Sequence, residues 1–156
     1  MAKMVDEGDK APNFSLAADG GGKVSLKDFA GKSLVLYFYP KDDTPGCTKE
    51  AIDFAAAAAK FKKLGLSVVG VSKDSVVAHD KFKMKHKLNF ALASDPEGKV
   101  IESYGSWIEK SMYGRKYMGI DRSTFLIDGK GRIAKIWRKV RVPGHVEEVI
   151  DAAKDL

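Results

Sequence analysis

The feature that most limits the folds open to this chain is an apolar strand followed at once by breaker residues and a long helix. The segment SLVLYFY, residues 33–39, is β-branched and aromatic without an internal breaker, which predicts a buried strand. PKDDTPG then supplies turn residues. CTKEAIDFAAAAAKFKKLG is rich in alanine and lysine and ends in glycine, so a helix is expected over about residues 45–64. LSVVGVS follows as a second buried strand.

Shorter segments on either side of this unit also have recognisable patterns. NFSLAADGGGKVSL predicts two short strands around a glycine turn, and SLKDFAG predicts a helical turn. The lysines of DSVVAHDKFKMKHKL alternate as in a strand, but position and length favour a helix. FALASD is expected to be a short strand, PEGKVIESYG a turn and short helix, and SWIEKSMYGRKYMGID a long loop.

The chain is expected to close with a hairpin and a helix. RSTFLIDGKGRIAKIWRKV predicts a β-hairpin with DGKG at its turn. PGHVEEVIDAAKDL predicts an amphipathic helix with Pro143 near its start, and the residues expected on one face are Val146, Val149, Ile150 and Ala153. Strands that alternate with helices, plus a closing hairpin, predict an α/β three-layer sandwich with a mixed central sheet and flanking helices. Without a linker or repeat, residues 1–156 are expected to form a single domain.

Composition narrows the class of protein. Hydrophobic residues at 44% and charged residues at 31% argue against disorder. The net charge of +6 comes from dispersed basic residues with clusters at KFKKLG and KFKMKHK, which favours solvated helix faces over a nucleic-acid site. The start lacks the apolar run of a signal peptide, and no apolar segment approaches membrane-spanning length. One cysteine excludes an intrachain disulfide, so a cytoplasmic protein is expected.

The single cysteine occupies a chemically informative position in TPGC. Pro45 fits the first helical position, which places Thr44 at the N-cap, Gly46 second and Cys47 third. A thiol there faces unpaired backbone N–H groups and the positive end of the helix dipole. Both favour the thiolate, which is the reactive form.

Helical spacing predicts the direction of that thiol. Phe54 and Phe61 lie seven and fourteen residues after Cys47 and share its face, and Ala57, Ala58 and Leu64 extend the stripe. The thiol should therefore point inward, where burial disfavours a thiolate unless a cation comes from elsewhere in the chain. A buried, inert cysteine is the alternative.

The segment around Cys47 resembles the corresponding segment of a known protein family. YFYPKDDTPGCTKE resembles the active-site segment of the bacterioferritin comigratory protein, or Q-type, group of peroxiredoxins. Six further segments resemble that group in the same order, over nearly the whole chain: APNFSL, LKDFAGKSLVLYFYP, GVSKDS, SDPEG, EKSMYG and GIDRSTFLIDGKGRI. The specific signal is Pro-x-x-x-Thr-x-x-Cys, here Pro40, Thr44 and Cys47. The resemblance implies a thioredoxin-like fold and cofactor-free, thiol-dependent reduction of hydrogen peroxide and organic hydroperoxides.

The resemblance also implies catalytic roles for individual residues. Cys47 would attack the terminal peroxide oxygen and become a sulfenic acid. Thr44 would hydrogen-bond the thiolate and the peroxide. Arg122 would be the missing cation, reaching the pocket from a neighbouring strand. The alternatives are an N-cap role alone for Thr44 and a surface position for Arg122.

Three further positions would shape the pocket. Pro40 would shield it from water, although it could simply end the strand. The backbone N–H groups of Gly46 and Cys47 would hold the peroxide, and Glu50 would orient the arginine. Among the histidines, His79 and His86 share a helix face and His145 lies near a helix start. No carboxylate–histidine pattern lies near them in the sequence, so no metal site is expected.

The sequence departs from the group at the resolving cysteine. Many relatives carry it five residues after the first cysteine, where this chain has Ile52; others carry it on the following helix, where HDKFKMKHK has none. Five residues at about 100° each place position 52 well away from the face of Cys47. The sulfenic acid must then meet an external thiol: thioredoxin, glutaredoxin, a small thiol or a second copy. A monomer is expected, with a weak or disulfide-linked dimer as the alternative.

Other functions remain as alternatives. A thiol–disulfide oxidoreductase is disfavoured because there is no Cys-x-x-Cys and no proline before TFLID. A cysteine hydrolase is disfavoured because no histidine lies in a recognisable partner context. A redox sensor would oxidise once and stop, whereas a peroxidase would turn over with added reductant. The sequence leaves open the reductant, the preferred peroxide and whether the missing cysteine is natural or engineered.

Overall fold

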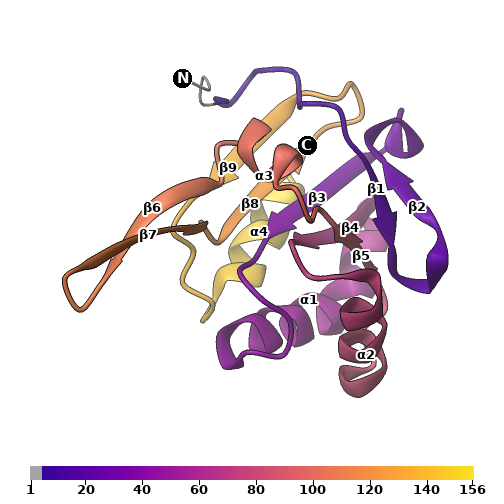
Figure 1. Ribbon diagram of the computed structural model, residues 1–156. Coiled ribbons are helices and arrows are strands. Elements are labelled where there is room, and N and C mark those ends of the chain that lie inside the picture. The colour runs from indigo at the N-terminus through magenta and orange to yellow at the C-terminus, as the bar shows by residue number, and fades with distance from the viewer. Residues whose placement is uncertain (1–4) are drawn as a thin grey trace.

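A seven-stranded mixed sheet runs through the centre of the computed structural model, which describes residues 5–156 (Figure 1). Its strand order is β2-β1-β5-β4-β3-β8-β9. The strands are β1 (Ser15–Ala18), β2 (Lys23–Ser25), β3 (Ser33–Phe38), β4 (Leu66–Ser72), β5 (Ala91–Ser94), β8 (Ser123–Ile127) and β9 (Ile133–Trp137). β3, β4 and β5 pair in parallel, and every other pairing in the sheet is antiparallel. The predicted strands and the mixed sheet are confirmed.

Helices cover both faces of this sheet, as the three-layer prediction required. The α-helices are α1 (Pro45–Lys63), α2 (Val76–His86), α3 (Lys99–Ser103) and α4 (His145–Ala153), and 3-10 turns span η1 (Asp19–Gly21) and η2 (Leu26–Phe29). Side chains of α1, α2 and α4 share one buried cluster with Tyr37 of β3. Ile101 of α3 belongs to the cluster on the other face, with Leu36 of β3. Neighbours on β3 thus point to opposite faces.

The segment predicted to be a long loop is instead a second, two-stranded sheet. β6 (Trp107–Met112) pairs antiparallel with β7 (Arg115–Ile120). The prediction was wrong because the outer part of this hairpin is exposed on both sides, so its residues show no apolar–polar alternation. The turn between the strands carries the overlooked signal: Tyr113 and Gly114 have φ angles of 51° and 77°, as a two-residue hairpin turn requires.

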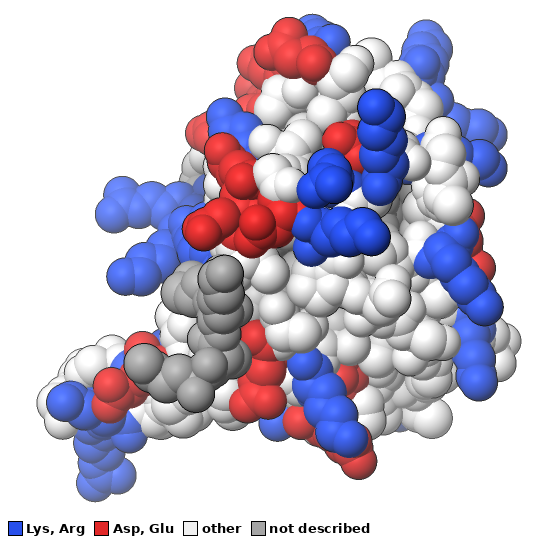
Figure 2. All heavy atoms as spheres, turned by 90° about the horizontal axis from the view of Figure 1, so that it is seen from above, with Lys and Arg blue, Asp and Glu red and all other residues white. Residues whose placement is uncertain are grey.

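Charged side chains of both signs are interspersed on the surface. Figure 2 shows lysines and arginines spread over one face, with acidic side chains between them. Several lysines have acidic partners, including Lys83 with Asp19 at 2.7 Å and Lys85 with Asp43 at 2.8 Å. Among the helices that residues 5–156 form, none combines the length and apolar character needed to cross a bilayer.

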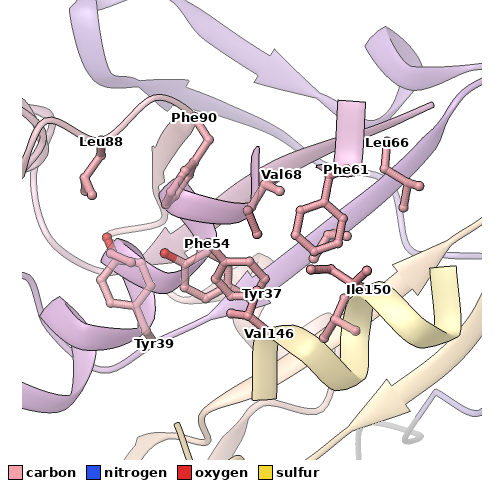
Figure 3. Packing of buried hydrophobic residues seen from close by; sticks show 14 of the residues in the cluster. Tyr37, Tyr39, Phe54, Phe61, Leu66, Val68, Leu88, Phe90, Val146 and Ile150 are labelled. Carbon is pink, nitrogen blue, oxygen red and sulfur yellow. The ribbon is translucent and has the colours of Figure 1, made fainter. Parts of the chain in front are cut away.

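Aromatic packing joins β3 to α1 and so positions the start of that helix. The rings of Tyr37 and Phe54 stack with centroids 4.6 Å apart, and Phe54 continues to Phe61 at 6.1 Å (Figure 3). All three side chains are essentially inaccessible to solvent. Burying aromatic rings of this size is worth a few kcal/mol each. The apolar face of α1 is therefore held against the end of β3.

The predicted apolar stripe of α1 is confirmed in part. Cys47, Phe54, Ala57 and Phe61 are buried, whereas Leu64 is 39% exposed because it caps the helix end. Ala58 is only partly buried, and the face instead includes Glu50 and Ala51. Ile52 is 44% exposed, in agreement with its predicted position away from Cys47.

Candidate active site

The loop after β3 delivers Cys47 to the start of α1. Pro40 is exposed at the beginning of this loop, and Thr44 occupies the predicted N-cap position. The Thr44 hydroxyl does not cap the helix; it donates to the carbonyl oxygen of Lys41 at 2.9 Å. Cys47 is the third helical residue, and only 2% of its surface is exposed. The inward direction predicted for its thiol is confirmed.

Arg122 is the cation that meets this thiol, 75 positions further along the chain. Its Nη2 atom donates to the Cys47 sulfur at 3.3 Å. Sheet register explains the encounter: β8 pairs antiparallel with β3, and Ser123 lies opposite Phe38. Arg122 therefore enters beside the carboxyl end of β3, where the chain turns into α1.

Glu50 holds the other side of the guanidinium. Its Oε1 atom accepts a hydrogen bond from Arg122 Nη1 at 2.7 Å, and the side chain is fully buried. Burial raises the pKa of Glu50 to about 7, although Arg122 lowers it. For Arg122, burial by itself lowers the pKa, but Glu50 and Cys47 raise it, and the net pKa lies above the ordinary value.

Backbone contacts fix the segment that carries the arginine. The Asp121 N–H donates to the Ser106 carbonyl at 2.7 Å, and an Asp121 carboxylate oxygen accepts from the Lys139 N–H at 3.1 Å. The Arg122 carbonyl accepts from the Val140 N–H at 2.9 Å. No local pattern marks Asp121, whose buried side chain links two loops that are distant in sequence.

Gly46 leaves the space into which the guanidinium fits. A β-carbon at this position would lie 3.2 Å from Nη2 of Arg122, closer than ordinary contact. From sequence, only a backbone N–H role is expected for Gly46, because the side chain that approaches it comes from the distant start of β8.

Two buried oxygens beneath the site are unusual. Among residues 5–156, the hydroxyl of Tyr37 and the Oε2 atom of Glu50 are buried without a hydrogen-bond partner. Burial, followed by the charges of Glu50 and Cys47, raises the pKa of Tyr37 well above its usual range. The phenol therefore stays neutral beneath the charged groups. From sequence, Tyr37 is expected only to be a residue of a buried strand.

Two histidines of α2 contact carboxylates of the active-site loop, which the sequence pattern did not indicate. His79 Nδ1 lies 2.6 Å from Asp42 Oδ2, and its Nε2 lies 2.9 Å from the Ala93 carbonyl oxygen. Asp42 also accepts from the Tyr39 hydroxyl. Asp42 and His79 are 37 positions apart, so no local pattern could indicate the pair. Both ring nitrogens of His79 lie within hydrogen-bonding distance of an oxygen atom.

The other two histidines have different surroundings. His86 Nε2 contacts Asp43 at 3.0 Å near the surface. His145 Nε2 lies 2.8 Å from the Thr124 hydroxyl in the interior. Burial, with a smaller contribution from Arg122, lowers the pKa of His145 to about 4, so this ring is neutral at physiological pH. Nowhere in the described part of the chain do three His, Cys, Asp or Glu side chains gather in a way that could hold a metal ion.

This geometry suits nucleophilic chemistry at sulfur. A buried sulfur at a helix N-terminus has a guanidinium within hydrogen-bonding distance, and a carboxylate fixes that guanidinium from behind. Both positive influences stabilise a thiolate. The same guanidinium can stabilise negative charge that develops on a bound electrophile.

A family model and the similar proteins of known sequence or structure all point to the same protein family. Residues 7–136 match the model of the AhpC/TSA family. Peroxiredoxin Bcp of Bacillus subtilis is 50% identical over 152 residues, which cover 97% of each chain.

Two solved structures resemble this one closely. A variant of Xylella fastidiosa PrxQ superposes with a TM-score of 0.93 at 39% identity over 98% of each chain. The bacterioferritin comigratory protein of Xanthomonas campestris, solved in a study of its alkyl peroxide reduction, gives 0.87 at 44% identity, over 91% of this chain and 90% of that one. The thioredoxin-like fold expected from the resemblance is confirmed.

Proposed function

This chain belongs to the AhpC/TSA family and is a thiol peroxidase of its Bcp, or Q-type, peroxiredoxins, and from that premise we propose how its own residues carry the reaction. Cys47 is the peroxidatic nucleophile, and Arg122 is its cationic partner. The observation that carries the proposal is the 3.3 Å contact from Arg122 Nη2 to the Cys47 sulfur. Glu50 is a positioning residue that acts through Arg122.

In the first step the Cys47 thiolate attacks the terminal oxygen of a hydroperoxide. A sulfur–oxygen bond forms as the oxygen–oxygen bond breaks, and cysteine is oxidised to the sulfenic acid. The leaving hydroxide or alkoxide takes up a proton and departs as water or an alcohol. Arg122 stabilises the negative charge that moves from sulfur to the leaving oxygen, because its guanidinium is already in place before the reaction.

In the second step an external thiol reduces the enzyme. The thiol attacks the sulfenic sulfur, water leaves, and a mixed disulfide forms; a second thiol then releases the Cys47 thiolate and carries away the disulfide. The chain contains one cysteine, so neither of these thiols can be its own. The reductant class comprises thioredoxin, glutaredoxin and small thiols.

Three further residues surround the peroxide in this proposal. Backbone N–H groups of Gly46 and Cys47, in the first turn of α1, donate to its oxygens. Thr44 rotates its hydroxyl from the Lys41 carbonyl towards the bound peroxide. Pro40, exposed at the rim, limits the entry of water.

We also propose the setting in which the chain works. One sheet carries both hydrophobic clusters, which supports a single domain over residues 1–156. The proposal includes a monomer and a cytoplasmic location, since an isolated thiol suits a reducing compartment. Sedimentation of the reduced protein tests whether it is a monomer, and fractionation of cells tests whether it is cytoplasmic.

The decisive experiment is stopped-flow oxidation of the reduced protein by hydrogen peroxide and by an organic hydroperoxide, with mass spectrometry of Cys47. We expect sulfenic acid to form far faster than on a free thiol, and dithiothreitol to sustain many turnovers. Cys47→Ser is the control and should consume no peroxide. Oxidation at the rate of a free thiol, or a single turnover without regeneration, would contradict the proposal.

A further inference from the structure

The hairpin of β6 and β7 is a two-stranded ribbon that projects from the body on the side where α1 begins (Figure 1). Figure 2 shows it at lower left, where basic, acidic and uncharged residues lie together. Its base adjoins the active site, because β7 ends at Ile120 and Arg122 follows two positions later. Nothing in the peroxide reaction described above uses the outer part of this ribbon.

Strand register separates the ribbon into two faces of different chemistry. Lys110 is paired with Tyr117, and Met112 with Arg115, so these four side chains project from one face. A β-carbon on Gly119 would meet Lys110 at 3.3 Å and Tyr117 at 3.4 Å, in agreement with this assignment. We call this the cationic face: it has two cations and large apolar groups, and no carboxylate lies among its pairs.

The opposite face presents a different set. Glu109 pairs with Met118, and Ser111 pairs with Lys116, so one acidic group accompanies one basic group. Adjacent residues of β7 therefore place similar side chains on opposite faces of the ribbon. Arg115 and Lys116 are both basic, and Tyr117 and Met118 are both large and mainly apolar.

Through Lys110, the cationic face lies near the charged groups of the active site. Burial lowers the pKa of Lys110, and Asp121, Arg122 and Cys47 all lie close enough for their charges to contribute. Further out, Tyr117 is 44% exposed and Met112 is 57% exposed. Leaving apolar groups of this size exposed is costly in a monomer.

We propose that the cationic face of the β6–β7 ribbon is the docking surface for a protein dithiol that reduces oxidised Cys47, and that this partner surrounds its thiol with apolar and acidic side chains. The inference rests on the proposed function, in which the second thiol must come from outside the chain. A small thiol needs no such surface, whereas a protein must bring its own sulfur to one that is 2% exposed. The two cations select an acidic rim, and they oppose pairing with the same face of a second copy.

Charge reversal on alternate residues tests this directly. Arg115→Glu and Lys116→Glu make the same change in net charge on opposite faces, and Tyr117→Ser and Met118→Ser form a second matched pair. Each variant is assayed with thioredoxin, with glutaredoxin and with dithiothreitol as reductant, and for direct oxidation of Cys47 by peroxide. We expect Arg115→Glu and Tyr117→Ser to raise the KM for a protein reductant about tenfold. Dithiothreitol turnover and peroxide oxidation should stay unchanged, as should every parameter of Lys116→Glu and Met118→Ser.

Three results would overturn the docking surface while the peroxidase function stands. The first is an equal loss in Arg115→Glu and Lys116→Glu, which would indicate net charge alone. The second is turnover of the unaltered protein with dithiothreitol but with neither protein reductant. The third is sedimentation of the unaltered protein as a dimer and of Arg115→Glu as a monomer. This result would show that the cationic face binds a second copy of the chain. Failure of dithiothreitol to regenerate the unaltered protein would instead overturn the proposed function, and the docking surface with it.

Discussion

Arg122 donates from Nη1 to Oε1 of Glu50 at 2.7 Å, inside a region where the Glu50 side chain is wholly buried. The second carboxylate oxygen of Glu50 has no hydrogen-bond partner among residues 5–156. Holding a carboxylate this way is costly, since one oxygen loses its water without compensation. The arginine that contacts Cys47 is therefore positioned at the expense of folding stability.

The first prediction concerns pH and the free energy of unfolding. Burial raises the pKa of Glu50 from 4.5 to about 7, so the folded state binds the proton more tightly than the unfolded state. The stability that this protonation contributes is fully present below pH 4.5 and is lost as pH rises through about 7. Glu50→Gln has no such proton, so its stability relative to the unaltered protein should increase over this range, by on the order of 3 kcal/mol. Urea unfolding of both proteins across the range measures it.

Taking the difference between the two proteins cancels other titrating groups, such as His145, whose pKa is lowered to about 4 by burial. Parallel stability curves for Glu50→Gln and the unaltered protein would show that Glu50 does not titrate in this range.

The second prediction separates the charge of Arg122 from its geometry. Arg122→Ala should slow the oxidation of Cys47 by hydrogen peroxide about 100-fold, because a preorganised donor to the reacting atoms is lost. Arg122→Lys retains the charge but cannot contact Cys47 and Glu50 with two separate nitrogens, so it should restore only part of the rate. Stopped-flow kinetics gives both rates. The absorbance of the Cys47 thiolate, followed as a function of pH, shows whether each variant needs a higher pH to form the thiolate. Equal rates for all three proteins would remove Arg122 from the mechanism.

The third prediction concerns space rather than charge. Gly46→Ala adds a β-carbon 3.2 Å from Nη2 of Arg122, which must then move away from the sulfur. Alanine is the better helix former, so folding stability should not fall, whereas peroxide oxidation should slow about tenfold. Gly22→Ala is the matched control, since nothing lies within 4 Å of its added carbon and its φ is not positive. A rate as high as that of the control would mean that the guanidinium accommodates the methyl group.

The fourth prediction compares two histidines of α2 that contact adjacent aspartates of the active-site loop. His79 is fully buried against Asp42, whereas Asp43, the partner of His86, is exposed. His79→Phe leaves Asp42 without one of its donors and should cost on the order of 3 kcal/mol. It should also slow peroxide oxidation, because this loop carries Pro40 and Thr44. His86→Phe should leave both the stability and the rate unchanged. Chemical denaturation and stopped-flow kinetics of the two variants measure these effects.

A large effect in His86→Phe, or none in His79→Phe, would show that the loop is not held through the buried pair. His79→Gln keeps a single donor and should fall between His79→Phe and the unaltered protein in both measurements.

Local pattern by itself determined the elements and the direction of the thiol. The strand before PKDDTPG, the helix start at Pro45 and the inward turn of Cys47 follow from propensity, capping position and helical spacing, all of which act within a few turns of chain. The hairpin of β6 and β7 escaped because its exposed strands have no alternation to detect. The likeness to peroxiredoxins named Arg122, but no spacing placed it beside Cys47.

Only the tertiary structure decided what surrounds that thiol. The antiparallel register that sets Ser123 opposite Phe38 brings Arg122 to Cys47 and, with it, to Glu50. The pairing of Asp42 with His79 likewise depends on a contact between segments separate in sequence. Such contacts depend on which strands pair and in which register, and these are fixed by packing of the whole core rather than by neighbouring residues.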